Sequence, residues 1–160
     1  MVRHYYHELF KDDPMHDAAN HVAAHTYELT EYLVDVLKVT DLGTSLPTPT
    51  RAVIHDACHG LRGLGIRNQP RALLRNVGNL TLNELTGHDQ CCGFGGLFAV
   101  KMSDISGAML NDKLANIGAA DADIVITGDC SCLMHMNGGL SRKNSPKRVV
   151  HVAEVLAGRI

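Results

Sequence analysis

Asp123-Ile124-Val125-Ile126-Thr127-Gly128-Asp129-Cys130-Ser131-Cys132 is the stretch that decides the fold of this 160-residue chain. Residues 124–126 are all β-branched, which predicts a short buried strand over 123–127. The strand leads directly into a glycine and two cysteines, and a helix is expected over 133–142. The sequence therefore predicts a unit of three parts: a buried strand, a loop with cysteines and a helix.

The same unit occurs twice more toward the N-terminus. Cys58 follows one apolar run, and the adjacent pair Cys91 and Cys92 follows another. The predicted strands span 52–55, 80–85, 123–127 and 148–151. Strands that alternate with helices indicate a parallel sheet with helices packed on its faces. We expect an α/β fold with a small parallel sheet of about four strands flanked by helices.

Helices are expected between the strands and also before the first one. A short helical segment over 3–10 and a long N-terminal helix over 16–38 precede a linker at 41–50. Further helices are predicted to begin at Pro70, to run from an N-cap at Ser103 to Gly118, and to span 152–158. We expect one domain over 1–160, with a helical N-terminal segment and linker at 1–50 and an α/β core at 51–160.

Composition narrows the class of protein. No apolar run is long enough to span a bilayer, and the first residues do not have the pattern of a signal peptide. We therefore expect the protein to be located in the reducing cytoplasm, where its five cysteines would not form structural disulfides. The net charge of -2 and the lack of a basic run argue against a nucleic-acid partner. Ten histidines, several beside cysteines, point to metal chemistry instead.

The topology predicts where the cysteines lie. In a parallel sheet all strand C-terminal ends meet at one edge, so the three cysteine-bearing loops are expected to converge there. Four or five thiolates gathered in one place suit a soft metal or an iron–sulfur cluster. Cys130 and Cys132 would point in different directions if their segment were extended, so only one of them is expected to face the site.

Several neighbouring residues are candidates for supporting roles. Three glycines of the cysteine loop leave backbone amides uncovered, which can donate hydrogen bonds to a cluster, and a helix N-terminus near the site favours an anion. Two histidines could complete a mixed Cys/His zinc site, whereas His55 is expected to be a satisfied core or edge residue. The candidates are Gly93, Gly95, Gly96 and the cation Arg62 as neighbours of the group, and His59, His135 and Cys130 as alternative ligands.

Three motifs make the chain resemble a known family. They are His55-Asp56-Ala57-Cys58-His59-Gly60-Leu61-Arg62, Cys91-Cys92-Gly93-Phe94-Gly95-Gly96 and Ser131-Cys132-Leu133-Met134-His135. Together they resemble the cysteine-rich CCG domain that occurs in heterodisulfide reductase and in the iron–sulfur protein of glycolate oxidase. The similarity to the lactate utilisation protein A family extends over essentially the whole chain.

This resemblance implies an electron-transfer module of a complex that oxidises L-lactate to pyruvate, with sister iron–sulfur proteins as partners. It carries Cys58, Cys91, Cys92 and Cys132 over as ligands of a 4Fe-4S-type cluster. The family usually ends in Cys-x-x-Cys, but Asp129 stands where the earlier cysteine would be, which favours four thiolates over five. The family also usually has two cysteine-rich units, so we expect this chain to be the second half, without its N-terminal cysteine-rich partner half.

Two other functions fit the same cysteines. One is a structural zinc module that uses three of the thiols and either another thiol or His59. The other is a thiol–disulfide redox enzyme of the heterodisulfide reductase type, in which Cys91 or Cys92 attacks a disulfide. No catalytic residue is identified from the sequence, and in an isolated fragment exposed to air the four thiols can be empty, oxidised or occupied by zinc.

Overall fold

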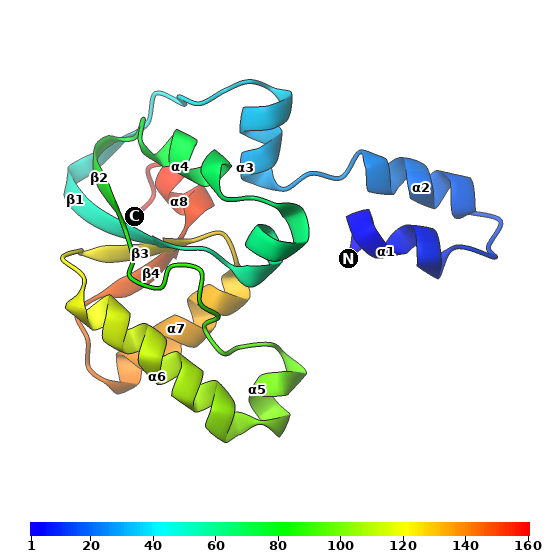
Figure 1. The fold of residues 1–160 in the computed structure, drawn as a ribbon. Helices are drawn as coiled ribbons and strands as arrows, with labels where there is room; N and C mark the ends of the chain where they lie inside the picture. Colours follow the sequence, from blue (N-terminus) through cyan, green and yellow to red (C-terminus); the bar gives the residue numbers. More distant parts are fainter.

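A four-stranded parallel sheet forms the centre of the molecule in the computed structural model, which describes residues 1–160 (Figure 1). Its strands are β1 (Ser45–His55), β2 (Gly78–Glu84), β3 (Ile124–Thr127) and β4 (Arg148–His151), in the spatial order β2-β1-β3-β4. Every neighbouring pair is parallel. The predicted α/β fold with a small parallel sheet is therefore confirmed.

Helices cover both faces of this sheet (Figure 1). The helices of the core are α4 (Asn68–Leu74), α5 (Leu97–Lys101), α6 (Ser103–Ala119), α7 (Cys130–Arg142), α8 (Val152–Leu156) and the π-helical turn η2 (His59–Leu64). One core cluster lies beneath α6 and α7 and includes Val53 and Val125, and the other lies beneath α4 and α8 and includes Ile54 and Ile126. Successive strand residues therefore alternate between the two layers.

The N-terminal region differs from the predicted long helix over 16–38. It contains α1 (Val2–Leu9), α2 (His16–Ala24), a short α3 (Leu29–Glu31) and the π-helical turn η1 (Tyr32–Val36). Side chains interrupt the backbone pattern, because Thr26 Oγ1 donates to the Val22 carbonyl at 2.7 Å and Glu28 accepts hydrogen bonds from Thr30 and Glu31 to start a new helix. Helical periodicity in the sequence does not reveal these local competitors.

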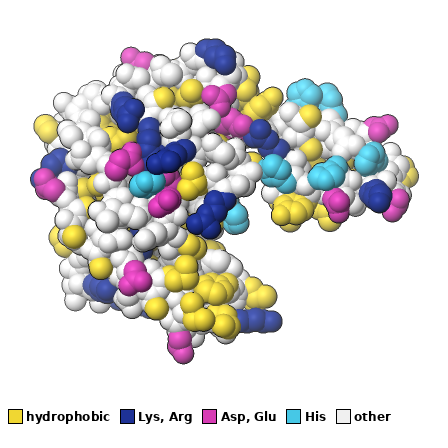
Figure 2. Space-filling view, viewed as in Figure 1, with side chains coloured by type: hydrophobic (Ala, Val, Ile, Leu, Met, Phe, Trp, Pro, Cys, Tyr) yellow, Lys and Arg dark blue, Asp and Glu magenta, His cyan; other side chains and the backbone are white.

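Helices α1 and α2 form a hairpin that projects from the body of the protein (Figure 1). Only Ala19 and Ala23 are buried in them, and an ion pair of 2.7 Å between Arg3 and Glu31 connects the hairpin to the segment before the sheet. Figure 2 shows histidines gathered on this hairpin.

The predicted linker at 41–50 is also only partly correct, because β1 begins at Ser45. In the sequence, Pro47 and Pro49 favour a loop. Both lie in the part of β1 where the pairing with β2 is irregular, between Ser45 and Thr50, so their missing N–H groups cost no ladder hydrogen bond.

The predicted boundaries of α6 and α7 shift by a few residues. Met102 rather than Ser103 precedes α6, and the helix ends at Ala119 instead of Gly118. Helix α7 begins at Cys130 rather than at 133, because Asp129 Oδ1 accepts hydrogen bonds from the backbone N–H groups of Ser131 and Cys132. Cys132 therefore lies in the first turn of α7.

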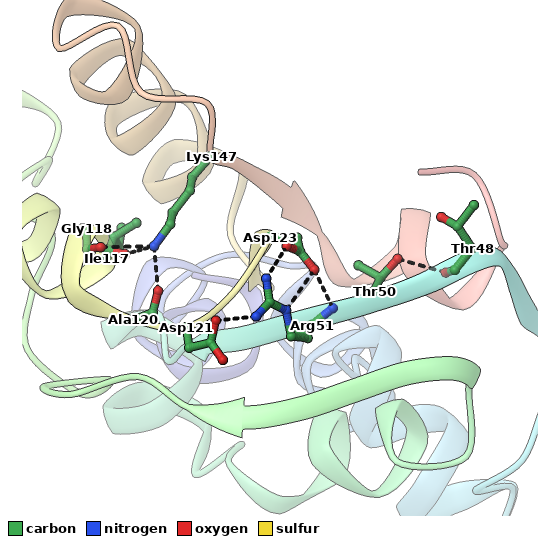
Figure 3. A network of polar contacts seen from close by, with 9 residues as sticks. All are labelled: Thr48, Thr50, Arg51, Ile117, Gly118, Ala120, Asp121, Asp123 and Lys147. Carbon is green, nitrogen blue, oxygen red and sulfur yellow. Dashed lines mark hydrogen bonds and ion pairs between the residues drawn. The ribbon is translucent and has the colours of Figure 1, made fainter.

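Polar groups at the amino-terminal edge of the sheet are paired with one another (Figure 3). The Arg51 backbone and guanidinium donate to Asp123, and Arg51 also pairs with Asp121. The Lys147 ammonium donates to the carbonyls of Ile117, Gly118 and Ala120 at the end of α6.

None of the helices combines the length and apolarity that crossing a bilayer requires.

Candidate metal centre

Three loops at the carboxyl edge of the sheet carry the cysteines, as the predicted topology requires. Cys58 follows β1 and precedes η2, the pair Cys91 and Cys92 lies between β2 and α5, and Cys132 lies on α7 just after β3. Strand β1 lies between β2 and β3 in the sheet, so the chain crosses from β1 to β2 on one side and later returns to β3 on the other side. The cysteines therefore surround the position at which strand order reverses, where open α/β sheets usually bind ligands.

Cys92 and Cys132 form the buried part of the site. Their Sγ atoms lie 3.3 Å apart, and both side chains are almost fully covered. Because the two sulfurs can share one proton, the Cys132 thiol lowers the pKa of Cys92 although burial acts in the opposite direction, and the pKa of Cys132 is raised. The pair therefore readily supplies one thiolate, and a bound cation would favour the second.

Cys58 and Cys91 are half-buried and lie beside this pair. Burial raises the pKa of the Cys58 thiol, and the negative charges of Cys91 and Cys92 raise it further. Cys58 therefore lies near Cys91 and Cys92, although neither Cys58 nor Cys91 belongs to the tight group that Cys92 and Cys132 form with His55. Cys130 is exposed, in agreement with the expectation that only one of Cys130 and Cys132 faces the site.

Gly93 fixes the approach of the cysteine loop to α6. Its φ is +91°, and a Cβ atom there would lie 2.5 Å from the Ser106 carbonyl oxygen. The Ser106 hydroxyl donates to the Gly93 carbonyl at 2.7 Å, while the Gly93 N–H donates to Cys91 Sγ at 3.4 Å. The glycine thus packs the loop against the helix and also stabilises negative charge on Cys91.

The other predicted neighbours of the site have different surroundings. Gly95 and Gly96 have φ values of +52° and +57°, so both support the left-handed turn that leads into α5. Arg62 is exposed on η2, and no hydrogen bond or ion pair joins it to a cysteine.

Lys113 is the buried cation that sequence reasoning missed. Its side chain is about 1% exposed, and its ammonium donates to the Gly87 carbonyl in the loop before the cysteine pair. Burial lowers the pKa of Lys113, while the charges of Cys92, Asp89, Cys91 and Cys132 oppose that change. A signal was present, since Lys113 follows Leu110 by three residues and so belongs to the apolar face of α6.

His55 was expected to be a satisfied core or edge residue; it is a core residue, but its ring nitrogens are not satisfied by hydrogen bonds. It is the last residue of β1, about 1% exposed, and neither ring nitrogen has a hydrogen-bond partner. A ring nitrogen and the Sγ atoms of Cys92 and Cys132 all lie within 4.8 Å of one another. Strand alternation could have revealed this, because His55 shares a face with the core residue Val53.

The two histidines predicted as alternative ligands lie differently. The His59 side chain is 91% exposed, and Nδ1 lies 3.9 Å from the Asp129 carboxylate. His135 is half-buried on α7, its ring packs edge-on against Phe94 at 5.7 Å, and its Nε2 has no partner. Neither belongs to the group formed by His55, Cys92 and Cys132.

A buried ion-pair network supports the loop that carries Cys58. The Asp56 carboxylate accepts two hydrogen bonds from Arg71, at 2.8 and 3.0 Å. His88 Nδ1 also lies within hydrogen-bond distance of this carboxylate, at 2.8 Å. Arg71 also pairs with Glu84 at the end of β2. Burial alone would raise the pKa of Asp56, but Arg71 and His88 hold it below its ordinary value. The network joins the ends of β1 and β2 to α4.

The donor set fits a thiolate-bound metal group. Four sulfurs, an unpartnered buried imidazole and a buried ammonium are grouped at one edge of the sheet, and thiolates are the ligands that soft metals and iron–sulfur clusters prefer. The N-terminus of α7, which has 13 residues, also lies at this edge and favours negative charge.

Comparison with known proteins bears on this centre. Residues 52–137, more than half of the chain, match the model of the cysteine-rich domain named CCG. The chain belongs to the CCG cysteine-rich domain family. The matched residues include all five cysteines, His55 and Lys113.

Relatives of the family share the similarity over nearly the whole chain. The chain is 48% identical over 158 residues to lactate utilization protein A 2 of Bacillus cereus (strain 03BB102), which covers 98% of this chain and 64% of the relative. It is 48% identical to lactate utilization protein A of Geobacillus kaustophilus and 46% identical to that of Bacillus subtilis, each over 160 residues, or 99% of this chain and 66% of the relative. The chain thus spans slightly less than two thirds of the length of these curated relatives.

Proposed function

We propose that this CCG domain is the iron–sulfur electron-transfer module of a cytoplasmic complex that oxidises L-lactate. Cys58, Cys91, Cys92 and Cys132 would hold a 4Fe-4S-type cluster at the carboxyl edge of the sheet. The observation that carries the proposal is the grouping of these thiols, which come from three separate loops at the carboxyl edge of the sheet. Such a cluster, when bound, supplies one-electron transfer.

The charge distribution around the thiols supports an anionic group. Lys113 places a buried ammonium near Cys91, Cys92 and Cys132, and the Gly93 N–H donates to the sulfur of Cys91. Both contacts reduce the cost of holding several thiolates together in a region that excludes water. The same groups would favour the reduced, more negative state of the centre.

The names of the relatives support a role in lactate utilisation. We extend the proposal to sister iron–sulfur proteins as partners and to an N-terminal cysteine-rich half that lies beside this one. An apolar patch at Leu97, Val100 and Met102 offers a surface for such a partner, since it is exposed on α5 and at the residue that follows it, next to the cysteine loop (Figure 2). Electron transfer between centres requires this kind of close approach.

Zinc is the second candidate, and one observation favours it. His55, Cys92 and Cys132 form a His/Cys/Cys group, and a fourth ligand from Cys58 or Cys91 would complete a tetrahedral site. A thiol–disulfide enzyme has less support, because Cys92 and Cys132 are both buried and Cys91 is only half-exposed, which restricts the approach of a disulfide substrate.

Anaerobic reconstitution separates iron–sulfur from zinc. The purified chain is incubated with ferrous iron and sulfide without oxygen, desalted, and analysed for iron, acid-labile sulfide and zinc together with its visible spectrum. We expect iron and sulfide in equal amounts, several of each per chain, and a broad brown absorption. Stoichiometric zinc in a colourless chain that takes up no iron or sulfide would overturn the proposal.

A further inference from the structure

His55 is buried beside the Cys92 thiol, whose pKa it lowers, but no well-formed hydrogen bond satisfies its ring nitrogens. The side chain is nearly completely buried at the end of β1, yet neither Nδ1 nor Nε2 makes a hydrogen bond. A buried polar group without a partner costs free energy, so native proteins almost always pair such groups with protein, water or a ligand. His55 therefore points to a missing component of the site.

The direction of the side chain shows where this component lies. Val53 belongs to the core layer that contains Cys92 and Cys132, and residues two apart on a strand face the same side of the sheet. His55 accordingly faces the thiols. Its Cα partner on β3, Thr127, faces the same layer and also has an unpartnered buried hydroxyl.

The size of the group suits a single metal ion. One ring nitrogen of His55 and two sulfurs lie within 4.8 Å of one another, and the two sulfurs are 3.3 Å apart. In a tetrahedral centre with metal–sulfur bonds of about 2.3 Å and metal–nitrogen bonds of about 2.0 Å, neighbouring ligand atoms are roughly 3.5–3.8 Å apart. The triangle therefore needs only small side-chain shifts to close around an ion.

The other histidines of the region do not share this geometry. His59 is exposed, and His135 lies outside the group although its Nε2 is unpartnered. His88 contacts Asp56 and is part of the ion-pair network. Only His55 combines complete burial, two unpartnered nitrogens and proximity to two sulfurs.

We propose that His55 binds a metal ion of the centre through a ring nitrogen, together with the sulfurs of Cys92 and Cys132. The inference deepens the proposed function and rests on it for the presence of a metal group. It adds a nitrogen donor that the four-cysteine set lacks, and an ion shared by His55, Cys92 and Cys132 departs from a cubane 4Fe-4S cluster, in which each iron takes one protein ligand. A neutral imidazole adds no negative charge to the ligand set, whereas a further thiolate at this position would add one. It therefore raises the reduction potential relative to an all-thiolate centre, as in other His-ligated iron–sulfur centres.

Pulsed electron paramagnetic resonance on the reduced centre tests this assignment. The chain is reconstituted anaerobically with iron and sulfide, reduced, and examined for hyperfine coupling to ¹⁴N, and the measurement is repeated on protein that carries ¹⁵N only in histidine. His55→Cys keeps a metal ligand but removes the nitrogen, and His135→Gln removes the rival unpartnered imidazole nitrogen. Iron and sulfide contents are measured for every sample.

We expect the wild-type chain and the His135→Gln variant to show the strong coupling of a directly bound nitrogen, which changes on histidine labelling. His55→Cys should retain iron but lose this coupling, and its reduction potential should fall. A wild-type centre that loads fully without such coupling, or a coupling that persists in His55→Cys, overturns the assignment and leaves the proposed function intact.

A wild-type chain that takes up no iron and sulfide instead overturns the proposed function. The wild-type spectrum alone decides the assignment if His55→Cys fails to fold. In that case His55→Ala in the apo-protein, checked by circular dichroism, should bind Co²⁺ at least tenfold more weakly than the wild-type chain.

Discussion

The two edges of the sheet differ in how their polar groups are satisfied. At the amino edge, Arg51 pairs with two aspartates and Lys147 donates to three backbone carbonyls, largely within reach of water (Figure 3). At the carboxyl edge, the His55 nitrogens and the Thr127 hydroxyl are buried without partners beside a group of thiols. The same strands, β1 and β3, connect the two edges.

This difference separates polar groups that stabilise the fold by pairing with one another from polar groups that are available to bind a ligand. Buried unpaired polar groups lower stability, and a protein tolerates them where another component completes them. The carboxyl edge is thus expected to gain stability on metal binding, whereas the amino edge is complete in the protein alone. Substitutions at the two edges should therefore have unequal consequences.

Removal of a buried thiol should abolish the centre. We expect Cys132→Ser to lower the iron bound after anaerobic reconstitution at least about tenfold, because serine cannot replace a thiolate ligand of a soft metal. Cys130→Ser is the matched control, since Cys130 lies two residues away on the same helix but is exposed. Equal iron loss in both variants would contradict the assignment of Cys132 to the site.

Truncation of Arg71 should destabilise the fold most. Arg71→Met leaves the Asp56 carboxylate buried without its main partner, and breaking such a pair typically costs about 3–5 kcal/mol. Urea denaturation of the apo-protein measures the effect. Arg75→Met, an exposed position next to the same helix, should change stability little.

The pH dependence of this variant has a defined sign. In the wild-type chain the pKa of Asp56 is below its ordinary value of 3.8, so its contribution to stability is present above that pH and is lost as the pH falls further. Without Arg71, burial disfavours the carboxylate. The deficit of Arg71→Met should therefore be largest near neutral pH and shrink as the pH falls through 3.8. A pH-independent deficit would show that packing, rather than charge, is responsible.

Lys113→Met should lower the reduction potential of the reconstituted centre. Loss of a buried positive charge near the thiols disfavours the more negative reduced state, by about 1–2 kcal/mol at an effective dielectric constant of about 20. Potentiometric titration measures the shift, and Lys101→Met on the exposed end of α5 is the control. An unchanged potential in Lys113→Met would mean that its ammonium does not interact with the centre.

Arg51→Met should have the smallest effect. Its ion pairs with Asp121 and Asp123 are at the surface, and the pKa of Asp123 is lowered to about 2 by the Arg51 hydrogen bonds. Exposed pairs contribute little and are screened by salt, so we expect a small loss of thermal stability that disappears at high salt, with unchanged iron content. Loss of iron in this variant would mean that the two edges are coupled.

The topology and the meeting of the cysteine loops could be predicted from the sequence, because both follow from strand periodicity and from the geometry of parallel sheets. The break in the helix over 16–38 could not, since Thr26 and Glu28 interrupt it through side-chain hydrogen bonds. Lys113 and His55 were missed for a different reason. Their types suggested surface or satisfied positions, and only their place on an apolar helix face and on a buried strand face reveals their role.

Hydrogen exchange before and after anaerobic loading compares the two edges directly. We predict that iron–sulfur loading slows amide exchange in residues 86–96 and 128–135, where the cysteines lie, and leaves residues 45–51 and 119–123 at the amino edge unchanged. Exchange that slows equally at both edges, or that does not change at the carboxyl edge although iron and sulfide are bound, would contradict the account.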